Sequence, residues 1–166
     1  MSIGRICSRI VHLADRGETV LAAASRMKAH DVGSLVVVDE HRHPIGLVTD
    51  RDLVMRVMAE GRAPEATRVE AVMSHQPRSV SATTPIEDVV ASMRAFGIRR
   101  MPVIGDSGEL IGIVSIDDVL DLLASELGNV RHVLAKSARG VAPPTRTSPS
   151  GRGQGSARHH AGGLHA

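Results

Sequence analysis

The chain has 166 residues, a formal net charge of +2 at pH 7, a 42% hydrophobic fraction and an aromatic fraction of only 1%. This length fits one domain or two small domains in tandem, and it excludes a large multidomain enzyme. Because the chain has no Trp, no Tyr and one Phe, a site that reads nucleic-acid bases by stacking them on aromatic rings is nearly excluded.

The first half of the chain is predicted to form one β-α-β-β-α unit. An opening helix is expected near residues 3–8, a brief strand at 11–13, and a helix from Val20 whose apolar residues recur at helical spacing. Residues 35–38 and 45–48 are short β-branched runs on either side of a turn, which is typical of a hairpin. A second amphipathic helix is predicted to end near Gly61.

The second half repeats this order after a linker at residues 62–68. An opening helix at 69–74 and a strand at 78–80 precede a helix that starts within 84–87, where Thr-Pro-Ile-Glu predicts a capping box with Pro at the first helical position. Strands are expected at 101–104 and 110–114 around a turn at 105–108. The closing helix is expected from Asp117 onward.

A single offset of 66 residues aligns the two halves without a gap, so that Gly46 falls on Gly112, Val48 on Val114 and Asp52 on Asp118. Each unit is too small to hold a secure core alone. We therefore predict an α/β fold of two repeats, 1–61 and 69–135, that pack about a pseudo-twofold axis.

The positive charge belongs to the C-terminal part of the chain. The last 31 residues hold five of the 20 basic residues and none of the 18 acidic ones. From Lys136 the composition shifts to Gly, Ser, Pro, Arg and His, which predicts a disordered basic tail at 136–166. Weak, salt-dependent binding of nucleic acid through this tail is one alternative function.

The motif with the most chemical content occurs once in each repeat, as GLVTDRD at 46–52 and GIVSIDD at 112–118. In both, a strand opens with Gly and runs into a hydroxyl residue that starts a helix, with Asp three residues later. One interpretation is a plain capping box, Thr49 with Asp52 and Ser115 with Asp118. The other is a nucleotide site, in which the helix N-terminus and hydroxyl bind phosphate and the carboxylate accepts from ribose hydroxyls.

These two segments, each at the end of a β-α-β-β-α unit, resemble the signature of the cystathionine-β-synthase (CBS) domain, and the tandem resembles a CBS pair, or Bateman module. The resemblance implies a regulatory module that binds AMP, ADP, ATP, S-adenosylmethionine or NAD in clefts between the repeats. It also implies that Asp52 and Asp118 take the ribose and that Thr49 and Ser115 bind phosphate. The base would be held near two segments of each repeat: Val11, His12 and Leu13 with Gly33 and Ser34, and Arg78, Ser79 and Val80 with Arg99 and Arg100.

The two predicted clefts are not chemically equal. Arg99 and Arg100 are either solvated or paired with phosphate, to which a guanidinium is well suited. Gly33 and Ser34 stand at the equivalent positions of the first repeat. We therefore expect the cleft with the two arginines to prefer the more phosphorylated ligand, and any adenine to lie between aliphatic side chains and backbone rather than on a ring.

Other functions have weaker support in the sequence. No nucleophile elbow or phosphate loop is present, so no enzyme is predicted. His41 and His43 lie beside Asp39 and Glu40 without the spacing of a closed metal site, so no metal is predicted. A protein-interaction module without ligand is a second alternative function, and the regulated protein is not identified by the sequence.

The expected setting is cytoplasmic. Cys7 is the only cysteine, which excludes an intramolecular disulfide, and no signal peptide or membrane span is predicted. A homodimer is expected, as CBS pairs commonly form. Apolar residues at alternating steps of three and four on the closing helix are either the core face of that helix or a dimer surface: Leu120, Leu123, Leu127, Val130 and Leu134.

Overall fold

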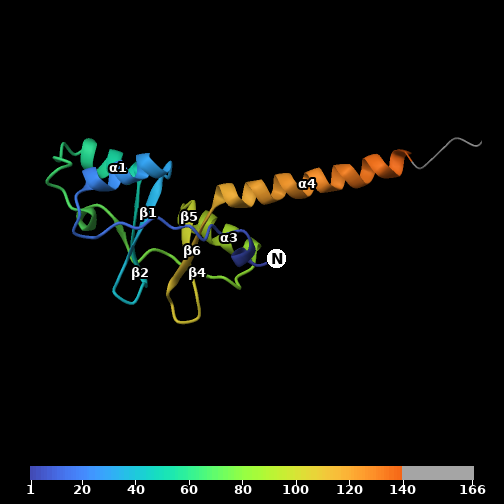
Figure 1. Cartoon of the computed structure of the whole chain (residues 1–166), viewed down its shortest axis with the longest axis horizontal. Coiled ribbons are helices and arrows are strands. Elements are labelled where there is room, and N and C mark those ends of the chain that lie inside the picture. Colours follow the sequence, from blue (N-terminus) through green and yellow to red (C-terminus); the bar gives the residue numbers. More distant parts are fainter. Residues whose placement is uncertain (140–166) are drawn as a thin grey trace, which may run out of the picture. The chain divides into compact units, whose positions relative to one another are not determined.

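Two antiparallel hairpins form the centre of the fold (Figure 1), in a computed structural model that describes residues 1–139. The first hairpin pairs β1 (Ser34–Val38) with β2 (Pro44–Thr49), and the second pairs β5 (Arg100–Ile104) with β6 (Leu110–Ser115). The registers are equivalent, because Ser34 faces Thr49 as Arg100 faces Ser115. The 66-residue repeat of the sequence is thus also a repeat of strand pairing.

A third strand completes each sheet. β3 (Ser74–His75) pairs antiparallel with β2, and β4 (Val80–Ser81) pairs parallel with β5. The strand predicted at 11–13 is reduced to one parallel bridge between Leu13 and Val36. The strand predicted at 78–80 starts only at Val80 and extends to Ser81.

Helices α1 (Val20–His30) and α3 (Ile86–Phe96) follow the predicted positions, but they begin differently. The Thr19 hydroxyl caps α1 by accepting from the N–H of Ala22. The capping box predicted at 84–87 is wrong, because Pro85 occupies the N-cap position and no side chain caps α3. There the N–H of Ile86 donates to the carbonyl of Met1, so the N-terminal segment of the chain caps this helix instead.

The two closing helices diverge after the repeated motif. α2 (Asp50–Leu53) makes one α turn and continues as the π-helix η2 (Val54–Met58), in which the N–H of Ala59 bonds the carbonyl of Val54. α4 (Ile116–Arg139) is a long helix that continues through Gly128. Residues 136–139 are therefore helical rather than part of a disordered tail, and the rest of the predicted tail lies outside the described residues.

Each repeat takes part of its core from the other half of the chain. The 3₁₀-helix η1 (Ile3–Arg5) places the side chains of Ile3 and Cys7 among the buried residues of β5, β6 and α3. The equivalent η3 (Val69–Ala71) places Val69, Val72 and Met73 among those of β1, β2 and α1. The opening segments are exchanged between the repeats, which fastens the two repeats to each other.

The glycines at the third positions of β2 and β6 are required by this exchange. A Cβ atom at Gly112 would lie 2.8 Å from the carbonyl oxygen of Ser8 and 3.0 Å from the sulfur of Cys7. At Gly46 the same atom would overlap the side chain of Met73. The repeated glycine of the motif therefore admits the exchanged segment, and its role is in packing.

The two hairpin turns also contact each other. The Nε2 atom of His43 lies 3.0 Å from the carbonyl oxygen of Ser107, and its Nδ1 atom lies 3.2 Å from the Asp39 carboxylate. The His43 ring thus bridges Asp39 in its own turn and Ser107 in the turn of the second repeat. Desolvation acts to raise the pKa of Asp39, but hydrogen bonds from His43 and His41 outweigh it and hold that pKa below its ordinary value.

Candidate functional site

The repeated motif forms a reciprocal cap at the start of α2. The Asp52 Oδ2 atom accepts from the N–H of Thr49 at 2.9 Å and from its hydroxyl at 2.7 Å, while the N–H of Asp52 donates back to the hydroxyl at 3.2 Å. This is the capping box that the sequence allows. A ligand that binds this motif without breaking the cap must therefore contact atoms that the cap does not use.

The second motif forms the same arrangement at the start of α4. The Asp118 Oδ2 atom accepts from the N–H of Ser115 at 2.6 Å and from its hydroxyl at 2.8 Å, and the N–H of Asp118 donates to that hydroxyl at 3.2 Å. In each carboxylate, one oxygen serves the cap and the other, Oδ1, does not. The environment of Oδ1 therefore decides what each carboxylate can bind.

The two Oδ1 atoms have different neighbours. Oδ1 of Asp52 lies 3.5 Å from the Nε of Arg56, one turn further along the chain. The position equivalent to Arg56 in the second repeat is Leu122. Among residues 1–139, no donor or cation is paired with Oδ1 of Asp118.

A cavity of about 370 Å³ lies beside Ser115 and Asp118. It is lined from both repeats, with loop residues that precede β1 on one side and the starts of β5 and α4 on the other. Seven of the predicted site residues line it: Val11, His12, Gly33, Ser34, Arg100, Ser115 and Asp118. We refer to this cavity as the Ser115 cleft.

Arg100 enters the Ser115 cleft next to Gly33. A Cβ atom on Gly33 would lie 3.2 Å from a terminal nitrogen of Arg100 and 3.1 Å from a carboxylate oxygen of Asp50. Gly33 therefore leaves room for the guanidinium. Arg100 and Gly33 were expected in separate clefts, but both line this one cavity, because the guanidinium of Arg100 reaches from the start of β5 to Gly33.

A stacked ring pair stands at one wall of this cleft. The rings of His12 and His30 are 4.3 Å apart at an interplanar angle of 26°. The equivalent residues of the second repeat also stack, with the Arg78 guanidinium 3.6 Å from the ring centre of Phe96. The aromatic count of the sequence missed this surface because it leaves histidine out, although an imidazole is also a flat ring.

The other predicted residues lie elsewhere. Arg99 is exposed and pairs with Asp117 at 3.7 Å, Ser79 donates its hydroxyl to the carbonyl of Pro77, and Val80 is buried in the core of the second repeat. Neither Thr49 nor Asp52 lines the Ser115 cleft. The structure thus gathers only part of the predicted site at one place.

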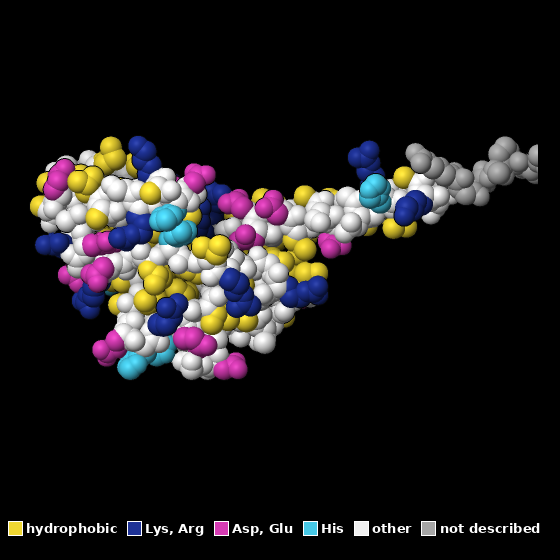
Figure 2. Space-filling view, in the orientation of Figure 1, with side chains coloured by type: hydrophobic (Ala, Val, Ile, Leu, Met, Phe, Trp, Pro, Cys, Tyr) yellow, Lys and Arg dark blue, Asp and Glu magenta, His cyan; other side chains and the backbone are white. Residues whose placement is uncertain are grey.

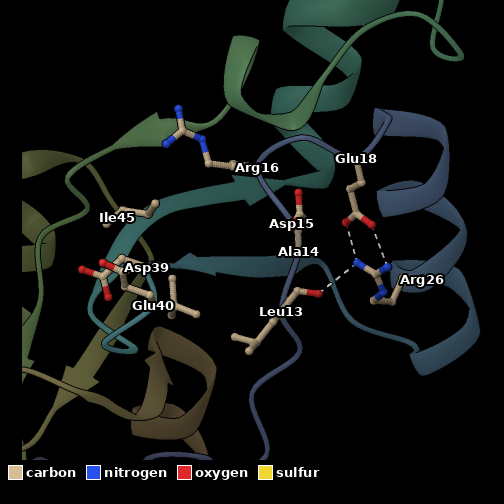
Figure 3. A pocket seen from close by; sticks show the side chains of 10 residues that line it. Leu13, Ala14, Asp15, Arg16, Glu18, Arg26, Asp39, Glu40 and Ile45 are labelled. Atoms are coloured by element: carbon tan, nitrogen blue, oxygen red, sulfur yellow. Dashed lines mark hydrogen bonds and ion pairs between the residues drawn. The ribbon is translucent and has the colours of Figure 1, made fainter.

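A second cavity, of about 580 Å³, contains none of the motif residues (Figure 3). Two of its charged side chains are paired with each other, because the Arg26 guanidinium bonds both oxygens of Glu18, at 2.5 and 2.7 Å, and also the carbonyl of Leu13 at 2.9 Å. The hydrogen bond to Glu18 raises the pKa of Arg26 above its ordinary value. Leu13, a predicted site residue, lines this cavity and not the Ser115 cleft.

Within residues 1–139, no group of three or more His, Cys, Asp or Glu side chains is arranged to hold a metal ion. No helix in this range is both long enough and apolar enough to cross a membrane.

The family follows from comparison with known proteins. The CBS domain family matches the chain twice, at residues 3–59 and 69–125, and the chain belongs to this family. Protein MK0525 of Methanopyrus kandleri is 36% identical over 122 residues, which are 74% of this chain and 62% of that protein. This chain therefore spans less than two thirds of the length of that relative.

Solved structures show the same fold. A protein with CBS domains from Burkholderia ambifaria MC40-6 has a TM-score of 0.70 at 29% identity, over 75% of this chain and 95% of that one. The CBS domain pair of protein MJ0100, solved in complex with 5′-methylthioadenosine and S-adenosyl-L-methionine, has a TM-score of 0.69 at 23% identity, over 76% and 98% of the two chains. At this low identity the likeness to MJ0100 establishes the fold alone.

Proposed function

We propose that this protein is a regulatory module that binds an adenosine-containing ligand, of the AMP, ADP or ATP class or S-adenosylmethionine or NAD, in the Ser115 cleft. The observation that supports it best is the convergence, in one cavity of about 370 Å³, of Ser115 and Asp118 with Arg100. These residues offer the donors and acceptors that a ribose and a phosphate require.

Each side chain of the cleft has a defined part in this proposal. The Oδ1 atom of Asp118 can accept from two adjacent ribose hydroxyls, because a carboxylate oxygen has two acceptor sites. The Ser115 hydroxyl turns from Asp118 toward a phosphate oxygen, while the Ser115 N–H continues to hold the carboxylate. Arg100 supplies the cation for the phosphate or for a carboxylate of the ligand.

The base has two surfaces available. Val11 presents a backbone N–H and carbonyl without a protein partner among the described residues, and these groups can bond the polar edge of adenine. The stacked His12 ring and the aliphatic Ile113 also line the cleft. The composition led us to expect adenine between aliphatic side chains and backbone. In this cleft adenine would also have the ring of His12 beside it.

Regulation follows from the position of the cleft. Because its walls come from both repeats, a bound ligand stabilises one mutual arrangement of the repeats over others. The surface that a partner protein recognises would change with that arrangement.

The single cysteine, Cys7, is unpaired and buried, which is consistent with a reducing, cytoplasmic setting.

A ligand panel tests this function. The full chain is titrated with AMP, ADP, ATP, NAD and S-adenosylmethionine by calorimetry, and its melting temperature is measured with each. At least one of these compounds is expected to raise the melting temperature, because a ligand that binds only the folded state stabilises it by mass action. If no compound binds, the motifs are helix caps only, and a protein-interaction module without ligand becomes the better interpretation.

We further propose that two copies associate through their closing helices. Large apolar side chains are exposed on this face in a single chain: Leu120 is 55%, Leu123 53% and Leu127 70% exposed, and Figure 2 shows hydrophobic side chains along α4. The alternative, that these residues form a core face, does not fit this exposure. Val54, the equivalent of Leu120, is exposed as well, whereas Val57, the equivalent of Leu123, is buried in the core of the first repeat.

Light scattering after size exclusion tests this association. The wild-type chain is expected to elute as a dimer, because contiguous exposed apolar side chains gain free energy when a partner covers them. Leu120→Glu with Leu123→Glu is expected to give a monomer with unchanged circular dichroism. A monomeric wild type at tens of micromolar would contradict the proposal.

A further inference from the structure

The two repeats carry the same motif, but the acid of the first repeat is already occupied. Oδ2 of Asp52 serves the cap of α2, and Oδ1 lies 3.5 Å from the Nε of Arg56. The carboxylate is also largely shielded, with 14% of its side chain exposed. Both oxygens of Asp52 thus have protein partners, and a ribose hydroxyl would have to displace one of them.

Arg56 is held in this position from a second side. Its Nη1 atom donates to the carbonyl oxygen of Val72 at 2.5 Å, in the segment that the second half of the chain inserts into the first core. Arg56 lies in the π-helix η2, directly after the single α turn of α2. The guanidinium is therefore fixed by a backbone carbonyl as well as by Asp52, and moving it breaks both interactions.

The second repeat has no such cation. Leu122 stands at the position equivalent to Arg56, and Oδ1 of Asp118 has no partner in the described part of the chain. Asp118 lines the Ser115 cleft, whereas Asp52 lines neither that cleft nor the larger cavity. The motif carboxylate is therefore occupied by a protein cation in the first repeat, whereas in the second repeat its Oδ1 atom is available to a ligand.

We infer that the protein binds one adenosyl ligand per chain, in the Ser115 cleft, and that Arg56 blocks the equivalent site by occupying Asp52. This inference rests on the proposed function and adds its stoichiometry and the residue that sets it. A sequence pattern with two equal motifs favours two sites. The difference is made by one side chain outside the motif, which is Arg in the first repeat and Leu in the second.

Calorimetric titration of the full chain with AMP, and separately with S-adenosylmethionine, tests the inference. The wild type is expected to bind one equivalent per chain. Asp118→Asn is expected to weaken binding by about tenfold or more, because a hydrogen bond to a charged group is lost. Asp52→Asn is the matched control, and its affinity is expected to stay within about twofold of wild type, since its Oδ1 serves only Arg56.

Substitutions at Arg56 and at its equivalent, Leu122, test whether Arg56 is what blocks the first site. Arg56→Leu copies the second repeat and is expected to add a second equivalent per chain. Leu122→Arg copies the first repeat and is expected to lower the affinity of the Ser115 cleft by about tenfold. Thermal unfolding by circular dichroism shows that each variant is folded, and Arg56→Met serves if Arg56→Leu is not.

The outcomes separate this inference from the proposed function. Absence of binding by the wild type to the whole panel of adenosyl compounds overturns the proposed function. Two equivalents bound by the wild type, or loss of binding in Asp52→Asn with retention in Asp118→Asn, overturns the inference while the proposed function stands. A folded Arg56→Leu or Arg56→Met that still binds one equivalent overturns the role of Arg56.

Discussion

Replacing Ile3 by alanine is expected to lower the free energy of unfolding by about 2–5 kcal/mol, although Ile3 is the third residue of the chain. Its side chain is 0% exposed and lies in a core with Val89 and Val103. The backbone around it is also fixed, because the N–H of Ile3 donates to the carbonyl of Thr84. The alanine variant leaves a cavity in the second repeat, about 80 residues away along the chain.

The matched control for this prediction is Ile10→Ala. It removes the same atoms from a side chain that is 76% exposed, and its effect is expected to stay within about 0.5 kcal/mol. Urea unfolding followed by circular dichroism gives both values. Hydrogen exchange then locates the change, which is expected at β5 and β6 more than at β1 and β2. Equal effects of the two substitutions would show that the opening segment is not part of the second core.

Replacing Arg100 by alanine is expected to weaken AMP binding by about 10- to 100-fold, because a charged hydrogen bond in a partly enclosed site contributes about 1.5–3 kcal/mol. Arg100 lines the Ser115 cleft, and Gly33 leaves room for its guanidinium. The affinity for adenosine, which has no phosphate, is expected to stay the same. The comparison of the two ligands isolates the phosphate contact from any general loosening of the cleft.

Arg99→Ala is the control at the neighbouring position. The Arg99 side chain is 72% exposed and faces Asp117, so its removal is expected to leave the affinities for AMP and adenosine unchanged. Calorimetry of the wild type and the two variants with AMP and with adenosine measures all the affinities that this comparison needs. If Arg99→Ala weakens AMP binding as much as Arg100→Ala does, or if Arg100→Ala has no effect, the assignment of the phosphate to Arg100 is wrong.

Local chemistry made much of the fold predictable. Apolar spacing located α1 and α3, and the β-branched runs located both hairpins, because these signals depend on neighbours along the chain. The capping boxes of Thr49 with Asp52 and of Ser115 with Asp118 could also be predicted, because the two residues of each box are only three positions apart. The predicted cap of α3 failed because its actual partner, Met1, is distant in sequence.

The site was predictable only as a set of residue types. The sequence left Arg99 and Arg100 equally as solvated residues or phosphate ligands, but only the structure shows that Arg100 enters the cleft while Arg99 pairs with Asp117. The stacking of His12 on His30 joins residues that lie on different segments. Such placements depend on how distant segments pack, and one sequence carries no direct record of that packing.

The sequence by itself determined the two-fold repeat at a 66-residue offset, the order of elements in each unit and the Thr/Ser-x-x-Asp motif, because each depends on local spacing. Only the tertiary structure decided that the opening segments are exchanged between the repeats and that the two motifs are unequal. Arg56 and Leu122 look unremarkable in the sequence. Their importance comes from the distance between the Arg56 guanidinium and Asp52, which the fold of η2 against Val72 sets.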